Sequence, residues 1–181
     1  MLEQVIVAGF GGQGVLRIGQ MITYAGFAEG KEVTWAPSYG PEMRGGTANC
    51  SCVISDEPIG TPVLMEANSI IVMNLPSLHK FEPVVIEGGK LFINSSIIKE
   101  KATRTDISVF YIEASDIAAE AGNALGANMV MLGAYVAATG IVQLETLYDL
   151  VKQTFTGSKA KFVDSNIECI KAGAEAIKAL V

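Results

Sequence analysis

Apolar runs and helical periodicities alternate along this chain from its first residues. Residues 4–8 form a largely apolar run that ends at Gly9, a pattern typical of a strand buried on both faces of a parallel sheet. Apolar residues then recur at helical spacing from 15 to 29, and residues 31–35 form a second strand-like run. A strand, a helix and a strand within about 35 residues predict a right-handed βαβ unit with parallel strands.

The rest of the chain continues this alternation and adds helices at its end. Further strands are predicted at residues 47–55, 69–73, 90–93 and 108–112. Further helices are predicted at residues 77–81, 115–124, 128–139, 143–155 and 164–180. We therefore predict the α/β class: a single Rossmann-like domain spanning residues 1–181, with a mostly parallel sheet flanked by helices and a helical C-terminal part.

The composition fits one folded domain and excludes some classes of partner. The chain has 181 residues, half of them apolar, which is enough for a sizeable core. Its net charge of -6 comes without a run of Lys or Arg, whereas binders of nucleic acid or of anionic membranes need a clustered basic surface. Only 18% of the residues are charged, against roughly 25% in an average soluble domain. This indicates either a buried interface or a small acidic enzyme with a large core.

Neither a secretory signal nor a membrane span is predicted. The N-terminus enters the first strand without a basic region or a cleavage site. Residues 121–144 carry no charge, but Gly122, Asn123, Gly126, Asn128 and Gly140 interrupt them. The remaining apolar helix has about a dozen residues, too few for a hydrocarbon core of roughly 30 Å. We therefore expect a cytoplasmic protein.

Metal clusters and zinc are not expected in this chain. Cys50 and Cys52 would share one face of a strand, and Cys169 falls in the predicted C-terminal helix. These cysteines form no C-x-x-C pair, and they are too few for a four-cysteine iron–sulfur site. His79 is the only histidine, so no imidazole pair is available for zinc. We predict buried free thiols and no bound metal, and we assign no catalytic residue.

A glycine-rich segment links the first predicted strand to the first predicted helix. It has the G-x-G-x-x-G spacing, and its candidate residues for binding a ligand or partner are Gly9, Gly11, Gly12, Gln13 and Gly14. Glycine lets the backbone approach a phosphate closely, and the first-turn N–H groups of the helix lack intrahelical partners. The segment is therefore a candidate site for an anionic ligand.

Three interpretations of the glycine segment stay open at this point. A nicotinamide or flavin dinucleotide would also need an Asp or Glu at the end of the second strand to hold the ribose hydroxyls, but the chain has Trp35, Ala36 and Pro37 there. In the second interpretation, the glycines only allow tight packing of helix and strand or the close approach of another chain. In the third, a phosphate-bearing ligand is held partly by a partner subunit.

A second segment, residues 36–46, combines turn-forming residues with reactive ones. Its prolines and glycines predict an ordered loop without regular structure. Its candidate binding residues are Ser38, Tyr39, Pro41, Glu42, Arg44, Gly45 and Gly46. Because the carboxyl ends of parallel strands share one edge of a sheet, we expect this loop beside the glycine segment. Alternatively, Glu42 and Arg44 pair with each other and only keep the loop ordered.

The two segments together resemble those of a known family. Gly9-Phe-Gly-Gly-Gln-Gly14 followed by Ser38-Tyr-Gly-Pro-Glu-Met-Arg-Gly-Gly46 is similar to the gamma subunits of 2-oxoacid:ferredoxin oxidoreductases. A third match, Gly122-Asn123 followed by Asn128-Met-Val-Met-Leu-Gly133, adds Asn128 to the candidate residues. The second segment resembles the 2-oxoglutarate or branched-chain type more than the pyruvate type, which often carries a second Arg before the matching one.

The resemblance implies a role within a multi-subunit enzyme. Such complexes convert a 2-oxoacid, coenzyme A and oxidised ferredoxin into acyl-coenzyme A, CO₂ and reduced ferredoxin. Their alpha and beta subunits hold thiamine diphosphate and magnesium, and iron–sulfur clusters lie on the beta subunit or on a ferredoxin-like delta subunit. The gamma subunit would bind none of these cofactors alone and would be inactive in isolation. It would aid assembly and coenzyme A access, with 2-oxoglutarate as the expected 2-oxoacid.

Two other classes of function remain as alternatives. The first is a free-standing flavin- or nicotinamide-binding oxidoreductase, for which the glycine segment would be the dinucleotide site. The second is a purely structural scaffold, for which that segment would serve packing alone.

Overall fold

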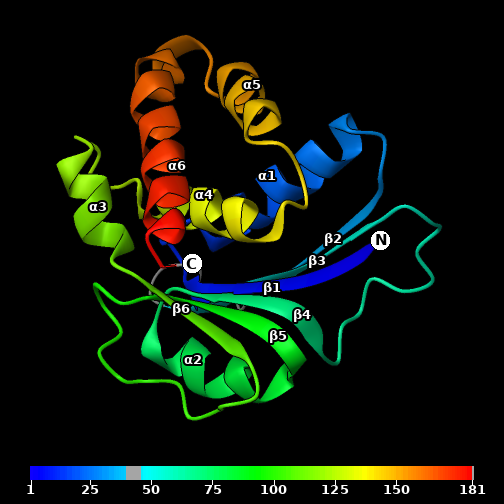
Figure 1. Ribbon diagram of the computed structural model, residues 1–181. Coiled ribbons are helices and arrows are strands. Elements are labelled where there is room, and N and C mark those ends of the chain that lie inside the picture. The colour runs from blue at the N-terminus through cyan, green and yellow to red at the C-terminus, as the bar shows by residue number, and fades with distance from the viewer. Residues whose placement is uncertain (40–45, 181) are drawn as a thin grey trace.

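The computed structural model describes residues 1–39 and 46–180, which form a six-stranded sheet with helices on both faces (Figure 1). The strands are β1 (Leu2–Phe10), β2 (Glu32–Tyr39), β3 (Thr47–Ser55), β4 (Ala67–Val72), β5 (Val85–Asn94) and β6 (Ser108–Ile112). The helices are α1 (Val15–Ala28), α2 (Leu75–Phe81), α3 (Ala114–Glu120), α4 (Ala127–Thr139), α5 (Leu144–Thr154) and α6 (Val163–Lys178), with short 3-10 helices η1 (Glu82–Val84) and η2 (Gly157–Phe162). The predicted α/β class is confirmed.

The sheet is mixed, with the strand order β2-β3-β1-β4-β5-β6. β1, β4, β5 and β6 run parallel, whereas β3 is antiparallel to both of its neighbours, β1 and β2. β1 and β2 therefore point the same way, as the predicted βαβ unit requires, but β3 lies between them. β3 pairs with β1 from Ser55 opposite Leu2 to Thr47 opposite Phe10. This pairing satisfies the backbone groups of β1 that point toward β3, and β4 pairs with the other side of β1 from Val5 to Ala8.

One predicted boundary is wrong for an identifiable reason. β2 continues to Tyr39, so the first part of the predicted loop 36–46 is strand. Pro37 is tolerated within it because β2 lies at the edge of the sheet, where one side of the strand has no neighbouring strand among the described residues. Residues 40–45 of the predicted loop lie outside the described residues.

Each face of the sheet carries its own apolar core. Val5 and Val7 of β1 belong to the core shared with α1, α3, α4, α5 and α6, whereas Ile6 belongs to the core around α2. Figure 1 shows these two layers on opposite sides of the sheet. All three side chains are at most 4% exposed, which explains why β1 is apolar at consecutive positions and not at alternate ones.

α4 lies at the centre of the larger helical layer and approaches α6 backbone to backbone. A Cβ built on Gly133 of α4 would lie 2.0 Å from the carbonyl oxygen of Ile170, and one built on Gly173 of α6 would lie 1.9 Å from that of Val130. The close approach of the two helices therefore requires both glycines. Although α4 is strongly apolar, no helix among the described residues has the length and apolarity needed to cross a membrane.

A buried phenol fixes α4 against the sheet. Tyr135 is fully buried, and its hydroxyl donates to Oε1 of Glu3 on β1 at 3.1 Å. The same oxygen accepts from Oγ of Ser69 on β4 at 2.6 Å. Burial, and after it the charge of Glu3, raise the pKa of Tyr135 well above its ordinary range.

The substitution Tyr135→Phe is expected to lower the free energy of unfolding by about 1–2 kcal/mol near neutral pH, because a buried hydrogen bond to a carboxylate is lost. The pKa of Tyr135 is higher in the folded chain than in the unfolded one. Its stabilising contribution is therefore complete below the unfolded pKa of about 10 and is lost as the pH rises through the folded value. Urea unfolding near pH 7 and again at about pH 11 measures this, with the half-exposed Tyr24→Phe as control. A difference between wild type and Tyr135→Phe that does not shrink at high pH would contradict the assignment.

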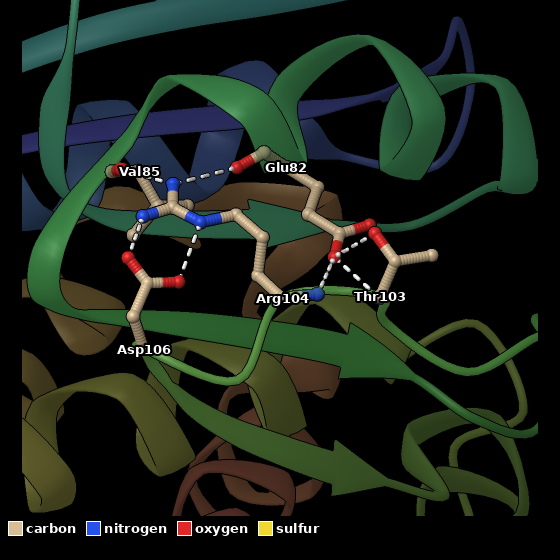
Figure 2. A network of polar contacts seen from close by, with 5 residues as sticks. All are labelled: Glu82, Val85, Thr103, Arg104 and Asp106. Carbon is tan, nitrogen blue, oxygen red and sulfur yellow. Dashed lines mark hydrogen bonds and ion pairs between the residues drawn. The ribbon is translucent and has the colours of Figure 1, made fainter.

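The connection between β5 and β6 has no regular secondary structure but is anchored by a buried carboxylate (Figure 2). Oε1 of Glu82 accepts from the backbone N–H of Thr103 at 2.5 Å, from its hydroxyl at 3.0 Å and from the backbone N–H of Arg104 at 2.8 Å. The Arg104 guanidinium donates to the carbonyl oxygen of Val85 and to both carboxylate oxygens of Asp106. Glu82 and Val85 thus bind the irregular connection at Thr103 and Arg104.

Candidate functional site

The glycine segment forms the turn between β1 and α1 at the carboxyl edge of the sheet. Gly12 and Gly14 have φ values of 98° and 74°, which are strained for residues that carry a Cβ. Gly14 is the N-cap of α1, and among the described residues no side chain caps the helix. The first N–H groups of α1, at the positive end of the helix dipole, therefore lie beside this turn.

The turn lies where the direction of the chain connections changes. From β1 the chain passes to α1 on one face of the sheet, whereas from the neighbouring strand β4 it passes to α2 on the other face (Figure 1). In open α/β sheets such a switch point leaves a crevice at the carboxyl edge, where ligands bind. Nε2 of Gln13 donates to the carbonyl oxygen of Met73 at 2.8 Å, so the glycine segment is bound to both strands of this crevice.

The described parts of the second segment reach the same edge. The backbone N–H of Gly11 donates to the carbonyl oxygen of Gly46 at 2.9 Å, so the segment returns to the glycine segment, as expected. Ser38 is exposed near the end of β2, and Tyr39 is the last residue of that strand. The other candidates lie outside the described residues: Pro41, Glu42, Arg44 and Gly45. Their binding roles stay a prediction.

The third segment closes the opposite side of the turn. A Cβ built on Gly14 would lie 2.4 Å from Nδ2 of Asn128, so Asn128 is in direct contact with the N-cap of α1. Asn123, in the turn before α4, donates from Nδ2 to Oδ1 of Asn166 on α6 at 3.0 Å. The start of α1 therefore meets the start of α4, and the turn before α4 is bonded to α6.

Two cavities adjoin the glycine segment. The larger has a volume of about 370 Å³ and is lined in part by Gly14, Arg17, Asn128, Phe155, Lys159 and Phe162. The smaller, of about 230 Å³, lies between the glycine segment and the start of β3. In the larger cavity the guanidinium of Arg17 lies 5.8 Å from the centre of the Phe155 ring. Cations beside aromatic rings suit a ligand with an anionic group and an apolar part.

Some residues of the larger cavity were missed by the sequence analysis. Arg17 could have been found, because it lies in the first turn of the helix that follows the glycine segment. Lys159 and Phe162 could not, because they reach the site from η2 and no local pattern connects them with the glycine segment.

The strand order disfavours a dinucleotide site of the usual kind. In that site the ribose-binding acid ends the strand next to the glycine loop. Here β3 separates β1 from β2, so the end of β2 lies two strand spacings, roughly 10 Å, from β1. In addition, the residues that end β2 include Pro37 and Ser38 but no acid. The free-standing dinucleotide enzyme is therefore the weaker interpretation.

The cysteines are packed inside the fold, and the histidine lies at its surface. All three cysteines are buried and free, as predicted. Cys50 lies against α1, where a Cβ on Gly19 would come within 2.4 Å of its Sγ. His79 pairs at the surface with Glu100, with 2.7 Å between Nε2 and Oε1. Within residues 1–39 and 46–180, no group of three or more His, Cys, Asp or Glu side chains is placed to hold a metal ion.

The fold and the edge around Gly14 define an α/β protein with a glycine turn at the switch point of a mixed sheet. The sequence pattern of the pyruvate ferredoxin/flavodoxin oxidoreductase family matches residues 4–176. The chain belongs to this family.

Relatives fall into two groups by length. The chain is 38% identical to the ketoisovalerate oxidoreductase subunit VorA of Methanothermobacter thermautotrophicus, over 95% of this chain but 36% of that protein. It therefore spans about a third of the length of that relative. It is 32% identical to the 2-oxoglutarate synthase subunit KorC of Methanothermobacter marburgensis, over 98% of this chain and 97% of that one.

A solved structure has the same fold over its whole length. The gamma subunit of a keto/oxoacid ferredoxin oxidoreductase from Geobacter sulfurreducens superposes with a TM-score of 0.83 at 27% identity, covering 98% of this chain and 99% of that one. The 2-oxoglutarate:ferredoxin oxidoreductase of Magnetococcus marinus, solved with 2-oxoglutarate, coenzyme A and succinyl-CoA bound, contains the fold with a TM-score of 0.90 at 22% identity. There the match covers 99% of this chain and 32% of that chain.

Proposed function

We propose that the chain is the gamma subunit of a thiamine diphosphate- and iron–sulfur-dependent 2-oxoacid:ferredoxin oxidoreductase, with residues 1–181 forming one gamma-type domain. The complex converts a 2-oxoacid, coenzyme A and oxidised ferredoxin into acyl-coenzyme A, CO₂ and reduced ferredoxin. We assign 2-oxoglutarate as the 2-oxoacid, because the match to the KorC relative covers 98% of this chain and 97% of that one. Ketoisovalerate is the competing substrate, because the identity to VorA is higher.

The observation that carries the proposal is the convergence of three segments around the glycine turn, which lines both cavities. Gly14 and Asn128 touch at the start of α1, Gly46 binds Gly11, and Arg17 lines the cavity beside them. Coenzyme A combines phosphates with a long, weakly polar pantetheine arm. Helix N–H groups and a guanidinium suit the phosphates, and the aromatic walls suit the arm. The proposed role of this edge is therefore coenzyme A access.

The same edge supports a role in assembly. Leu125 is 93% exposed and lines the larger cavity together with the exposed Phe162, and the exposed Phe10 ends β1 at the glycine segment. Large exposed apolar groups that gather in one place mark interaction surfaces. The proposed partners are the alpha and beta subunits and a ferredoxin-like delta subunit. These chains would carry the thiamine diphosphate, the magnesium and the iron–sulfur clusters.

Reconstitution tests the proposal directly. The isolated chain is expected to show no oxidation of any 2-oxoacid, because the chemistry requires the cofactors held by its partners. Co-expressed with the alpha, beta and delta chains, it is expected to restore coenzyme A-dependent ferredoxin reduction. The ratio kcat/KM is measured for 2-oxoglutarate and for ketoisovalerate, and a complex assembled without this chain is the control. Turnover by the chain alone, or full activity of the complex without it, would refute the proposal.

A further inference from the structure

The amide of Gln13 is engaged at both ends within the chain. Oε1 accepts from the backbone N–H of Phe10 at 2.7 Å, and Nε2 donates to the carbonyl oxygen of Met73 at 2.8 Å. The backbone N–H of Gln13 also donates to the carbonyl oxygen of Phe10 at 3.1 Å. One side chain therefore joins the end of β1, the glycine turn and the residue that follows β4.

The first glycine of the segment makes room for this amide. A Cβ built on Gly9 would lie 2.7 Å from Oε1 of Gln13 and 2.9 Å from Cβ of Met73. Neither contact is tolerable for a real side chain. Gly9 has no positive φ, so its lack of a side chain is explained by the close packing of Gln13, Met73 and Val15 against it and not by a special backbone conformation.

We infer that Gln13 is the positioning residue of the glycine segment: its amide holds the turn, and with it the N-terminus of α1, in place for coenzyme A. This inference rests on the proposed function. The turn contains Gly12 and Gly14 at positive φ, and glycine restricts the backbone less than any other residue. Such a turn needs an external constraint to keep one path. Gln13 provides this constraint by tying the turn to Met73 on the far side of the switch point.

The variants are chosen because the Gln13 amide accepts one hydrogen bond, from Phe10, and donates the other, to Met73. Gln13→Met keeps the length and volume of the side chain but removes both hydrogen bonds. Gln13→Glu keeps an oxygen that can accept from Phe10 N–H but loses the donor to Met73. Gln153→Met is the matched control, because Gln153 is exposed on α5.

The first measurement is backbone amide exchange of Phe10 in the isolated chain, followed by NMR. In Gln13→Met the exchange is expected to accelerate about 2- to 10-fold, the equivalent of one lost hydrogen bond. In Gln13→Glu it is expected to lie between the wild-type and the Gln13→Met rates, because the acceptor for the Phe10 N–H is retained but the bond that ties the turn to Met73 is lost. Unchanged exchange in Gln13→Met would overturn the inference. If Gln13→Met does not fold, accelerated exchange in Gln13→Glu would support the inference, because the bond to Met73 is lost there, and a wild-type rate would overturn it.

The second measurement is kinetic and uses the reconstituted complex. With Gln13→Met, the KM for coenzyme A is expected to rise about 2- to 10-fold, while kcat and the KM for the 2-oxoacid stay unchanged. A lower kcat with an unchanged KM for coenzyme A would mean that less complex is assembled, which contradicts a positioning role. If the wild-type complex shows no coenzyme A-dependent oxidation, the proposed function fails, and the exchange of Phe10 still decides whether Gln13 holds the turn.

Discussion

The substitution Gly133→Ala is expected to destabilise the folded chain by about 3 kcal/mol or more, near the upper end of the range for overpacked cores. The new Cβ would lie 2.0 Å from the carbonyl oxygen of Ile170 and 2.7 Å from its carbonyl carbon. Both atoms belong to the backbone of α6, so no side-chain rotation can relieve the contact. The gain of about 1 kcal/mol in helix propensity on replacing Gly is too small to offset the clash. Urea unfolding monitored by circular dichroism measures the effect.

The control and a double variant make this prediction specific. Gly60→Ala adds the same methyl group where no described atom lies within 4 Å of it, and it is expected to change stability by less than about 0.5 kcal/mol. Gly173→Ala creates the reciprocal clash with Val130 across the same interface. Once one methyl group has separated α4 from α6, the second should cost less, so the double variant should lose less than the sum of the single losses. If Gly133→Ala is as stable as Gly60→Ala, α4 and α6 do not approach each other as closely as described.

The order of helices and strands was predictable because the periodicities are strong. Ile70, Ile71 and Val72 of β4 are all fully buried, so their consecutive apolar run is typical of a strand covered on both faces. In α6, Ile170, Ala174 and Ile177 lie on one buried face, as their helical spacing predicts. A run of consecutive apolar residues in a strand thus indicates that helices cover both faces of the sheet.

The direction of β3 was not predictable from its own residues. A strand places successive side chains on opposite faces whether its neighbours run parallel or antiparallel. What decides the direction is the pairing of β3 with both β1 and β2, which is a long-range contact. The same limit applies to β2, whose extension through Pro37 depends on its edge position in the sheet.

The candidate site shows the same division between local and distant contacts. The glycine turn and the free start of α1 were predictable, because a strand, a glycine run and a helix are adjacent in the sequence. The contact between Gly14 and Asn128 and the cavity walls from η2 come from distant parts of the chain. The hydrogen bond from the Gln13 amide to another part of the chain was not predictable either, because it depends on the carbonyl oxygen of Met73 lying within reach.

The substitution Glu82→Ala is expected to lower the free energy of unfolding by about 3 kcal/mol, because three donors lose their shared acceptor at once. Glu82 is 5% exposed, and its Oε1 binds two backbone N–H groups and the Thr103 hydroxyl in the connection of residues 95–107 (Figure 2). Each unsatisfied buried donor costs about 1–3 kcal/mol, and water entering the vacated space recovers part of this.

Two variants separate this anchoring role from a general effect of removing a carboxylate. Glu82→Gln keeps one acceptor oxygen, so it is expected to lose less than half as much stability as Glu82→Ala. Glu120→Ala removes an exposed carboxylate at the end of α3 and should change stability by less than about 0.5 kcal/mol. Exchange of the Thr103 and Arg104 amides should accelerate in Glu82→Ala more than that of β1 amides, because the connection opens before the sheet unfolds. Equal acceleration everywhere would mean that the connection unfolds only with the whole chain, and that Glu82 stabilises the fold without holding this connection separately.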